Sequence, residues 1–595
     1  MFSSLLVAVS AISVALGAGL GDIKHVVILM QEGRSFDHYF GTMAGVRGFH
    51  DPNVKVVDGK SVYFQKTGRN DTSRLLPFHL AANETYREPS QCFVTPDDGG
   101  SSFDAWNDGK MDSWVINYGP YSWSYFKRED IPTHFEIAEG WTIADMYSES
   151  DLTIPGLDRT GEPYGRKEGD QMLKEQFLKN VGVTWYGKKD NSLALSRGQL
   201  KNVDRPKWQN VSRGINEQEG AQFHDIEMFF ELAKNGNLTA LTYIMTPPDL
   251  SELAPVRPND GAWFQKRVIE AVTNSPQYNQ TALFISYGDT GGFGDHVEPY
   301  ISQKGTEDEW VQTFPSGNVS SLVPTGPGFR VPFYAISPYT RGGRVFTEPS
   351  DHYSQLLFLE KWAREAYNLN FTVASIPQWR REHMSDLVNM FNFDRPDISV
   401  PVLTQMEEPN FHMNGTTDNV QKCQEKYKDL AEPPVPYGNQ TEATSLQYEK
   451  GYKLLRGNLT EGRYLVIERY QENRSARSNN IPFASTLKDG LVDFTTSPGC
   501  TQYSCVEERF TVHNIDSDSN KFYLKSYLTK SYMDNNAMPT NTSERAAPLT
   551  ILFDPAEGYT IQNDEGKYLL FSFSSLEEPQ FSHIRTTYNF YSVSY

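Results

Sequence analysis

The sequence predicts an α/β domain with a mostly parallel sheet flanked by helices, followed by a C-terminal antiparallel β domain. Up to about residue 400, short apolar runs rich in β-branched residues alternate with longer segments of helical pattern, as in parallel sheets with helical crossovers. Residues 441–595 instead show short β-like runs separated by Asp, Asn, Gly and Ser turns. Residues 401–440 are polar and rich in proline, which favours a linker. We therefore place the α/β domain at residues 20–400.

The individual elements follow from the apolar runs. In the α/β domain the sequence predicts strands at Val26–Met30, Trp141–Met146, Ala240–Met245, Ala282–Tyr287 and Phe333–Ile336. It predicts helices at Met172–Asn180, His224–Lys234, Trp263–Thr273 and His352–Ala366. In the C-terminal domain it predicts strands at Gly462–Tyr470, Cys505–Asn514, Lys521–Leu528, Leu549–Phe553, Tyr559–Gln562 and Tyr568–Phe573. Two long irregular segments, 45–130 and 185–222, are typical of lids or binding loops, although glycosylated surface decoration is an equal alternative for the second.

Composition narrows the class of partner. The chain has 595 residues, 38% of them hydrophobic and 13% aromatic, so it is long enough for a large core and two or three domains. Its net charge of -20 argues against binding to nucleic acid or to an anionic membrane surface. The acidic residues are spread along the chain, which favours a role in solubility.

Several features predict secretion. Residues 1–19 have the short apolar run and small residues of a signal peptide, and no later stretch approaches the roughly 18 apolar residues that span a membrane. Asn-x-Ser/Thr sequons predict glycosylation at Asn70, Asn83, Asn210, Asn237, Asn279, Asn318, Asn370, Asn414, Asn439, Asn458, Asn473 and Asn541. Cys500 and Cys505 are close enough for a local disulfide, which leaves Cys92 with Cys423 as the long-range option. No cysteine spacing suggests a zinc site.

The stretch Ile23–Gly41 joins a buried strand to a helix through a polar loop. Ser35 is a plausible helix N-cap, and the loop before it carries Glu32 and Arg34. Because open α/β sheets bind ligands where strands end, this acid and base are candidates for chemistry. A surface turn with a salt bridge is the equally weighted alternative.

This stretch resembles the opening motif Glu-Asn-Arg-Ser-Phe-Asp-His-Tyr-Phe-Gly of the phospholipase C and acid phosphatase type phosphoesterases, a branch of the alkaline phosphatase-like superfamily. The chain matches at Glu32 and at every position from Arg34 to Gly41. Further motifs follow the family pattern, and the later ones resemble its fungal branch: Gly109–Asp112, Arg128–His134, Asp260–Trp263, Asp295–Val297, Arg341–Gly343, Asp351–His352, Val435–Glu442 and Leu459–Tyr464. The resemblance implies that a metal ion and a Thr or Ser nucleophile transfer a phosphoryl group.

The positions that this chemistry requires are altered. The family's metal-binding Asn is Gly33, and its second Asp-Glu pair after a Tyr is Gly288-Asp289. The nucleophile position holds Pro155, although Thr153 lies two residues earlier. A histidine that would meet the phosphate is replaced by Leu253. Losing ligands and nucleophile together would cost phosphoryl transfer many orders of magnitude, so we predict a dismantled hydrolytic site without a metal.

Other family positions are retained and are the candidate site residues: Glu32, Arg34, Asp37, His38, His134, Asp289, Asp295, His296, Asp351 and His352. The Asp–His pairs either support loops through hydrogen bonds or act as acid and base in a metal-free reaction. Aromatic residues of the first irregular segment either line an apolar pocket or pack in the core: Trp106, Trp114, Tyr121, Trp123 and Tyr125. The substitutions are expected to leave the old pocket roomier and less polar.

Together these observations predict a secreted phosphoesterase-fold protein that no longer hydrolyses phosphoesters. We expect it to bind an organic or lipidic ligand, or to catalyse a cyclisation, isomerisation or elimination without a cofactor. One alternative is an active phospholipase C or phosphatase with a divalent metal. A second is a non-catalytic interaction protein that binds through its β domain.

Overall fold

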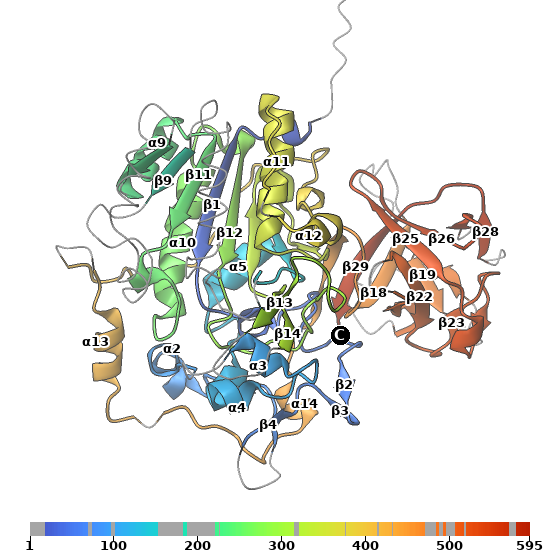
Figure 1. Ribbon diagram of the computed structural model, residues 1–595, viewed down its shortest axis with the longest axis horizontal. Coiled ribbons are helices and arrows are strands. Elements are labelled where there is room, and N and C mark those ends of the chain that lie inside the picture. Colours follow the sequence, from blue (N-terminus) through green and yellow to red (C-terminus); the bar gives the residue numbers. More distant parts are fainter. Residues whose placement is uncertain are drawn as a thin grey trace, which may run out of the picture.

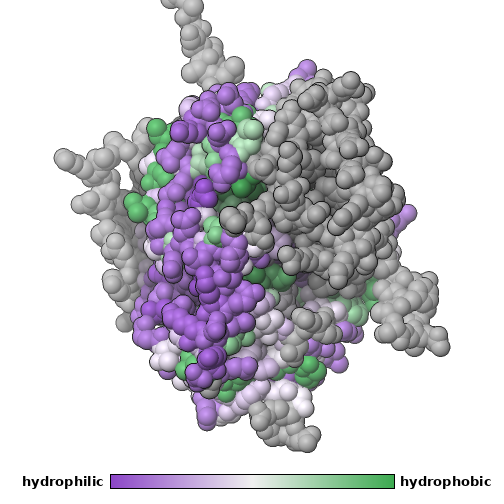
Figure 2. Space-filling view, turned by 90° about the vertical axis from the view of Figure 1, so that its left-hand side faces the viewer, coloured by the Kyte–Doolittle hydropathy of each residue, from purple (hydrophilic) through white to green (hydrophobic). Residues whose placement is uncertain are grey.

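The computed structural model describes residues 18–68, 74–96, 101–150, 152, 183–186, 221–224, 226–313, 321–374, 376–412, 416–430, 432–469, 483–486, 492–495, 506–516, 519–570 and 579–595. An α/β part and a β part lie side by side (Figure 1). Figure 2 shows the side that is on the left in Figure 1, where hydrophilic residues cover most of the described surface and hydrophobic ones are scattered.

The α/β part is built on a mixed sheet. Its pairing order is β10–β9–β11–β1–β12–β15–β8–β16, with parallel pairs except where β15 runs antiparallel to β12 and to β8. The strands are β1 His25–Gln31, β8 Thr142–Ala144, β9 Val183–Tyr186, β10 Ala221–His224, β11 Leu241–Met245, β12 Thr281–Tyr287, β15 Phe333–Ile336 and β16 Arg344–Phe346. Most described residues of β1 and all of β12 and β15 are buried, which explains their continuous apolar runs.

Helices pack on this sheet and on the irregular segments. They are α1 Phe36–Phe40, α2 Pro89–Phe93, α3 Ser102–Trp106, α4 Trp114–Tyr118, α5 Pro132–Gly140, α9 Ile226–Asn235, α10 Pro258–Thr273, α11 His352–Tyr367, α12 Gln378–His383, α13 Asn419–Lys426 and α14 Glu442–Ser445. In α11 the side chains of Phe358, Leu359 and Trp362 are fully buried. The Trp362 indole N–H also donates to the carbonyl of Ile23, 2.8 Å away. This bond fixes α11 against the start of β1. No helix among the described residues is long and apolar enough to cross a membrane.

The segment 45–130 contains short elements rather than one structureless loop. Besides α2, α3 and α4 it holds the two-residue strands β2 Val56–Val57, β3 Lys60–Ser61, β4 Gln65–Lys66, β5 Arg74–Leu75, β6 Phe78–His79 and β7 Ser124–Tyr125. A further hairpin, β13 Trp310–Thr313 with β14 Ser321–Pro324, lies between β12 and β15 in the chain. Most of the other predicted irregular segment, 185–222, lies outside the described residues.

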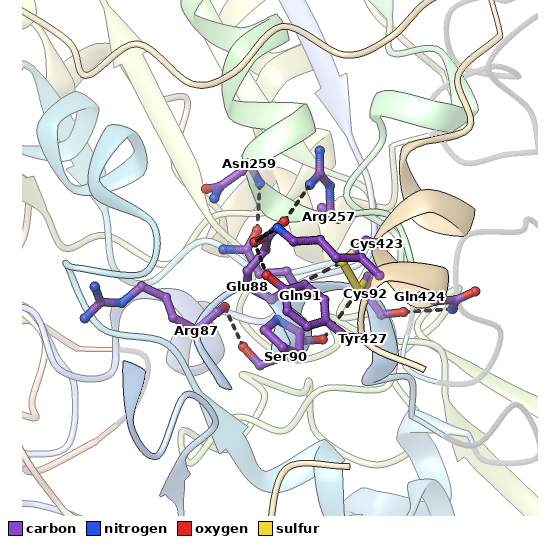
Figure 3. The surroundings of a disulfide bond; sticks show 12 residues. Arg87, Glu88, Ser90, Gln91, Cys92, Arg257, Asn259, Cys423, Gln424 and Tyr427 are labelled. Carbon is purple, nitrogen blue, oxygen red and sulfur yellow. Dashed lines mark hydrogen bonds and ion pairs between the residues drawn. A yellow bond between two sulfur atoms is a disulfide. The ribbon is translucent and has the colours of Figure 1, made fainter. Parts of the chain in front are cut away.

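A disulfide ties the first irregular segment to residues far along the chain. Cys92 in α2 is bonded to Cys423 in α13, which confirms the long-range option (Figure 3). Next to it Gln424 donates to the Cys92 carbonyl over 2.9 Å, and Gln91 accepts from the Asn259 N–H of α10 over 3.3 Å. The cross-link closes a loop of 331 residues, which in general restricts the unfolded chain strongly.

The C-terminal part is an antiparallel β domain, as predicted. Its strands are β17 Gly451–Arg456, β18 Tyr464–Arg469, β19 Phe483–Thr486, β20 Val492–Thr495, β21 Phe510–Asn514, β22 Lys521–Ser526, β23 Tyr532–Met533, β24 Pro539–Thr540, β25 Leu549–Asp554, β26 Gly558–Gln562, β27 Tyr568–Leu570, β28 Gln580–Ser582 and β29 Tyr588–Ser594. The final strand, β29, pairs with both β17 and β18. A parallel pairing of β16 with β17 joins this domain to the first sheet.

The predicted strands and helices of the α/β part agree with described elements wherever the structure covers them. The predicted helix Met172–Asn180 lies outside the described residues, as do Thr153 and Pro155. Ser35 is the N-cap of α1, because its Oγ accepts from the backbone N–H of His38 over 3.2 Å.

Candidate functional site

Three carboxyl side chains gather at the edge where the parallel strands end. Gln31 at the end of β1 lies opposite Tyr287 at the end of β12. Glu32 directly follows Gln31, and Asp289 lies two residues after Tyr287. Both side chains therefore lie at the same edge of the sheet. Glu149, which follows β8, joins them there. Its two oxygens accept from the backbone N–H groups of Phe329 and Thr290, each over 3.2 Å.

The electrostatics of these three groups favour bound protons. Burial, together with the charge of Asp289, raises the pKa of Glu32 to about 8. Burial also raises the pKa of Asp289, and burial plus the charge of Asp289 raise the pKa of Glu149 well above its ordinary value. Glu32 and Asp289 remain partly exposed, whereas Glu149 is buried. Near neutral pH Glu32 therefore holds a proton that an ordinary carboxyl group would have lost.

Gly33 has a conformation and a neighbour that exclude the family's Asn ligand. Its φ is +74°, and a Cβ at this position would lie 2.5 Å from Cδ1 and 2.8 Å from Cα of Leu253. Leu253 thus fills the space in which an Asn side chain would project, so the expected roomier pocket is wrong at this position. Gly288 is different, because a Cβ there would meet nothing closer than the Gln31 carbonyl at 3.6 Å.

Arg34 is held inside the protein. Its Nε donates to the Glu252 carbonyl over 2.8 Å, and its Nη2 donates to the Val256 carbonyl over 3.2 Å. Its Nη1 donates to Nε2 of His38 over 3.1 Å, while Nδ1–H of His38 donates to the Ser124 carbonyl over 2.7 Å. Burial and then the Arg34 charge lower the pKa of His38 well below its ordinary value. These contacts fix the loop after β1.

His134 belongs to a second buried cluster, centred on Glu252. Nε2 of His134 lies 3.1 Å from Oε2 of Glu252. The same carboxylate accepts from the hydroxyls of Tyr39 at 2.7 Å and Tyr287 at 2.9 Å, and from the amide of Gln265 at 2.7 Å. All the acceptor capacity of Glu252 is therefore directed to side chains of the core, and His134 helps to satisfy it.

The adjacent residues Asp295 and His296 do not pair with each other. Nδ1 of His296 lies 2.6 Å from Oδ2 of Asp37, and its Nε2 lies 3.3 Å from Oδ2 of Asp51. Asp295 is bound instead by Arg330, through Nε at 2.9 Å and Nη2 at 3.0 Å. Burial disfavours the charge of His296, but Asp37 and Asp51 outweigh it and raise its pKa to about 9.

Asp351 and His352 also have separate partners. Asp351 is the N-cap of α11, accepting from the Ser354 N–H over 3.2 Å, and it forms an ion pair with Arg380. Nε2–H of His352 donates to the Tyr287 carbonyl over 2.9 Å, and burial lowers its pKa. In both Asp–His dipeptides the two side chains therefore bind different partners, because neighbouring side chains on a loop or at a helix start point in different directions.

The residues present do not fit the metal site that the resemblance implies. The amide ligand is Gly33, with Leu253 against it. Among the described His, Cys, Asp and Glu residues, the group whose ligand atoms all lie within 4.8 Å of one another consists of Asp37, Asp295 and His296. Its two carboxylates already bind the Arg330 guanidinium, whose Nη2 lies 2.9 Å from Oδ1 of Asp37. The carboxyl groups after β1, β8 and β12 do not converge in this way.

The aromatic residues of segment 45–130 pack in the core. Trp114, Trp123 and Tyr125 are buried, and Trp106 and Tyr121 are partly buried against the same core. The Trp114 ring lies 4.6 Å from that of Phe329, edge to face, a common core geometry. Of the sequon residues, Asn458 is partly buried, and those exposed in the described part are Asn83, Asn237, Asn279, Asn370, Asn439 and Asn541.

Glu149, which the sequence analysis does not include among the candidates, has a signal in the sequence. It lies three residues after the predicted strand Trp141–Met146, much as Glu32 lies two residues after the predicted strand Val26–Met30. Acidic residues that follow successive strands of a parallel sheet share an edge, so this pattern indicates Glu149 as a neighbour. Arg330, which compensates Asp37 and Asp295, carries no comparable local signal.

The chain belongs to the Phosphoesterase family, because the sequence model of that family matches residues 23–157 and 164–364. It is 33% identical to a non-hemolytic phospholipase C of Burkholderia pseudomallei over 64% of this chain and 61% of that protein. It is 30% identical to a non-hemolytic phospholipase C of Pseudomonas aeruginosa over 64% and 58% of the two chains. Phospholipase C A of Mycobacterium tuberculosis is 30% identical over 72% and 89%. The chain thus spans about three fifths of the length of the first two relatives.

Proposed function

We propose that this chain keeps the phosphoesterase fold but acts on an organic or lipidic ligand without a bound divalent metal. Its role is binding or a non-hydrolytic acid–base reaction such as a cyclisation, isomerisation or elimination. The packing of Leu253 against Gly33 carries the proposal, because it removes both the amide ligand and the space for it. The engagement of Asp37 and Asp295 by Arg330 supports it, since these carboxylates are already charge-compensated.

Glu32 and Asp289 are the groups proposed to act on the ligand. Both are partly exposed at the strand ends, and the pKa of Glu32 near 8 suits a proton donor at neutral pH. A general acid works best when its pKa lies near the operating pH, so no metal is needed to activate it. Arg34, His134, His296 and His352 are proposed to position the surrounding loops rather than to react.

Phosphoester hydrolysis is the second candidate. It is favoured by identity of about 30% to several phospholipases C and by the two carboxyl groups retained at the strand ends. Under this alternative Thr153 would act as the nucleophile, because Pro155 occupies the family's nucleophile position. A third candidate, a non-catalytic interaction protein, requires the β domain alone to bind its partner.

The fold and location complete the proposal. We assign the α/β domain, residues 20–400, to the alkaline phosphatase-like superfamily, on the strength of its family membership. Residues 401–440 are proposed as the connecting segment and 441–595 as the β domain. Residues 1–19 and the exposed sequons support secretion as a glycoprotein.

Metal analysis together with an ester assay tests this proposal. The purified protein is expected to contain less than stoichiometric divalent metal and to hydrolyse p-nitrophenyl phosphate and p-nitrophenylphosphorylcholine at background rates. The matched variants Glu32→Gln and Pro155→Thr should not change those rates. Stoichiometric metal with turnover that chelation abolishes would overturn the proposal and establish the second candidate.

A ligand screen then distinguishes a ligand site at the strand ends from binding by the β domain. Apolar compounds that raise the melting temperature of the native protein, but not of Glu32→Gln, would support action at the strand ends. Stabilisation that is unchanged in Glu32→Gln and Asp289→Asn would contradict it and favour binding by the β domain.

A further inference from the structure

A cleft of about 750 Å³ lies where the α/β domain meets the β domain. The parallel pairing of Val345 with Leu455 and of Phe346 with Arg456 joins the two domains beside it. Residues of both domains line the cleft, among them Arg344, Asn392 and Arg395 from the first and Arg456, Phe553 and Tyr591 from the second. The cleft is separate from the carboxyl groups at the strand ends, none of which lines it.

Guanidinium groups are concentrated in this cleft, although the chain as a whole is strongly acidic. Arg344, Arg395, Arg456 and Arg585 line it, against the acidic residues Asp394 and Glu557. Burial, and then repulsion from Arg395, lower the pKa of Arg344 to about 10. Burial, and then repulsion from Arg344, lower that of Arg456 to about 9. A bound anion would relieve the desolvation and repulsion of these cations.

The arginines differ in how fully they are already bonded. Arg456 donates to the carbonyls of Asn389, Phe391 and Pro555, and Arg585 pairs with Asp554 and Glu557. In contrast, Nη1 of Arg344 is buried and makes no hydrogen bond within the described part of the chain. The same is true of Oδ1 of Asn392, another lining residue. Unbonded buried polar atoms are rare in folded proteins and cost free energy, so Arg344 and Asn392 retain hydrogen-bonding capacity that a ligand in the cleft can use once these side chains turn toward it.

We propose that the interdomain cleft binds a ligand that carries an oxyanion, a phosphate, sulfate or carboxylate, through the guanidinium groups of Arg344 and Arg395. A guanidinium fork matches the geometry of these groups and forms charge-assisted hydrogen bonds to them. The amide of Asn392 then bonds a polar group next to the oxyanion. The rings of Phe553 and Tyr591 contact the body of the ligand. This inference does not depend on the proposed function.

Acidic groups that face the same arginines limit the strength of the site. The charge of Asp397 favours the protonated form of Arg344, and the charge of Asp394 favours that of Arg456. Both are exposed, so their charges are screened more strongly by solvent than that of a ligand inside the cleft. The ligand can be a free anion or an anion attached to an apolar group. Inorganic phosphate and n-octyl phosphate represent these two cases in the experiment.

Isothermal titration of the full-length protein at low ionic strength tests the site with two probes, inorganic phosphate and monomeric n-octyl phosphate. Saturable binding of either probe is expected, and tighter binding of octyl phosphate identifies an amphiphilic ligand. Arg344→Gln and Arg395→Gln should each weaken binding about tenfold, since each removes charge-assisted hydrogen bonds. Octyl glucoside, which lacks the oxyanion, should not bind.

The matched control is Arg585→Gln, which alters an arginine of the same cleft whose charge is already paired with Asp554 and Glu557. It should change phosphate binding less than threefold. Arg344→Lys keeps the charge but loses the fork, and it provides a folded variant if Arg344→Gln does not fold. Absence of saturation up to about 10 mM of both probes, which corresponds to binding weaker than about -2.7 kcal/mol, would overturn the proposal. So would wild-type affinity in Arg344→Gln and Arg395→Gln.

Discussion

The carboxyl groups at the strand ends and those around Arg330 are of the same type but have different surroundings. Asp37, Asp51 and Asp295 lie among Arg47, Arg330 and His296, whose charges compensate theirs. Glu32, Glu149 and Asp289 accept backbone hydrogen bonds or reach solvent, and their pKa values rise.

The difference shows that retention of an acidic residue in a family motif does not fix its role. Where nearby cations outweigh burial, as they do for Asp37 and Asp51, the pKa of the carboxyl group is lowered, whereas burial still raises the pKa of Asp295 beside Arg330. Where no cation is near, burial raises the pKa of the carboxyl group, and that of Glu32 reaches about 8.

Arg330→Met should have the largest effect. It leaves the buried Asp295 without its cation and Asp37 with His296 alone, and breaking a buried ion pair in this way costs about 3–5 kcal/mol. Urea unfolding monitored by tryptophan fluorescence measures the loss. Arg330→Lys is the control and should lose less, because it keeps the charge. A loss below about 1 kcal/mol for Arg330→Met would contradict the assigned role.

His296 should make stability depend on pH in the alkaline range. Its folded-state pKa of about 9 lies above its ordinary value of 6.5, so the folded state binds the proton more tightly. The resulting stabilisation is complete below pH 6.5 and is lost as pH rises through 9. Unfolding measured at pH 7 and pH 9.5 should show a decrease that is absent in His296→Gln. An equal decrease in that variant would assign the effect to another group.

Gly33→Asn should destabilise the protein by about 1–3 kcal/mol, because the new Cβ meets Leu253 at 2.5 Å. The double variant with Leu253→Ala should recover part of the loss. Gly288→Ala is the control, since its Cβ would meet only ordinary contacts, and it should change stability little. Thermal unfolding of the four proteins decides the point, and full tolerance of Gly33→Asn would show that the family's ligand can still be accommodated.

Glu32→Gln should have the smallest effect on stability and a distinct pH window. The raised pKa of Glu32 means that ionisation costs the folded state stability as pH rises from about 4.5 to about 8. The variant should therefore melt slightly higher than the wild type at pH 8 and at the same temperature at pH 4. Because Glu32 is partly exposed, solvent screens the effect. A variant less stable at pH 8 would show that Glu32 forms a favourable ionised contact.

Much of the fold could be predicted from local sequence. The buried strands β1 and β12 are continuous apolar runs, and Ser35 precedes its helix with the expected N-cap chemistry. The strands β17 and β29 were not predicted, because Lys453 interrupts the apolar pattern of the first and Asn589 that of the second. These strands are held by pairing across the domain, with Tyr452 opposite Val593, which no local window contains.

The candidate site could be predicted only in part. The sequence identified Glu32 from its place after a recognisable strand and Asp289 from its place in a family motif after Tyr287. It could not identify Arg330 as the partner of Asp37, since 293 residues separate them. It also placed space beside Gly33 that Leu253 occupies, because a substitution to glycine does not reveal what packs against it.

The sequence by itself therefore determined the family, the two classes of domain and the residues that lie at the strand ends. These properties depend on periodicity and on short motifs, which are local. The tertiary structure alone decided which carboxyl groups are compensated, what fills the place of the lost ligand, and that arginines of two domains share one cleft. Charge compensation and packing are set by contacts between residues distant in the chain, and the protonation state of each buried group depends on them.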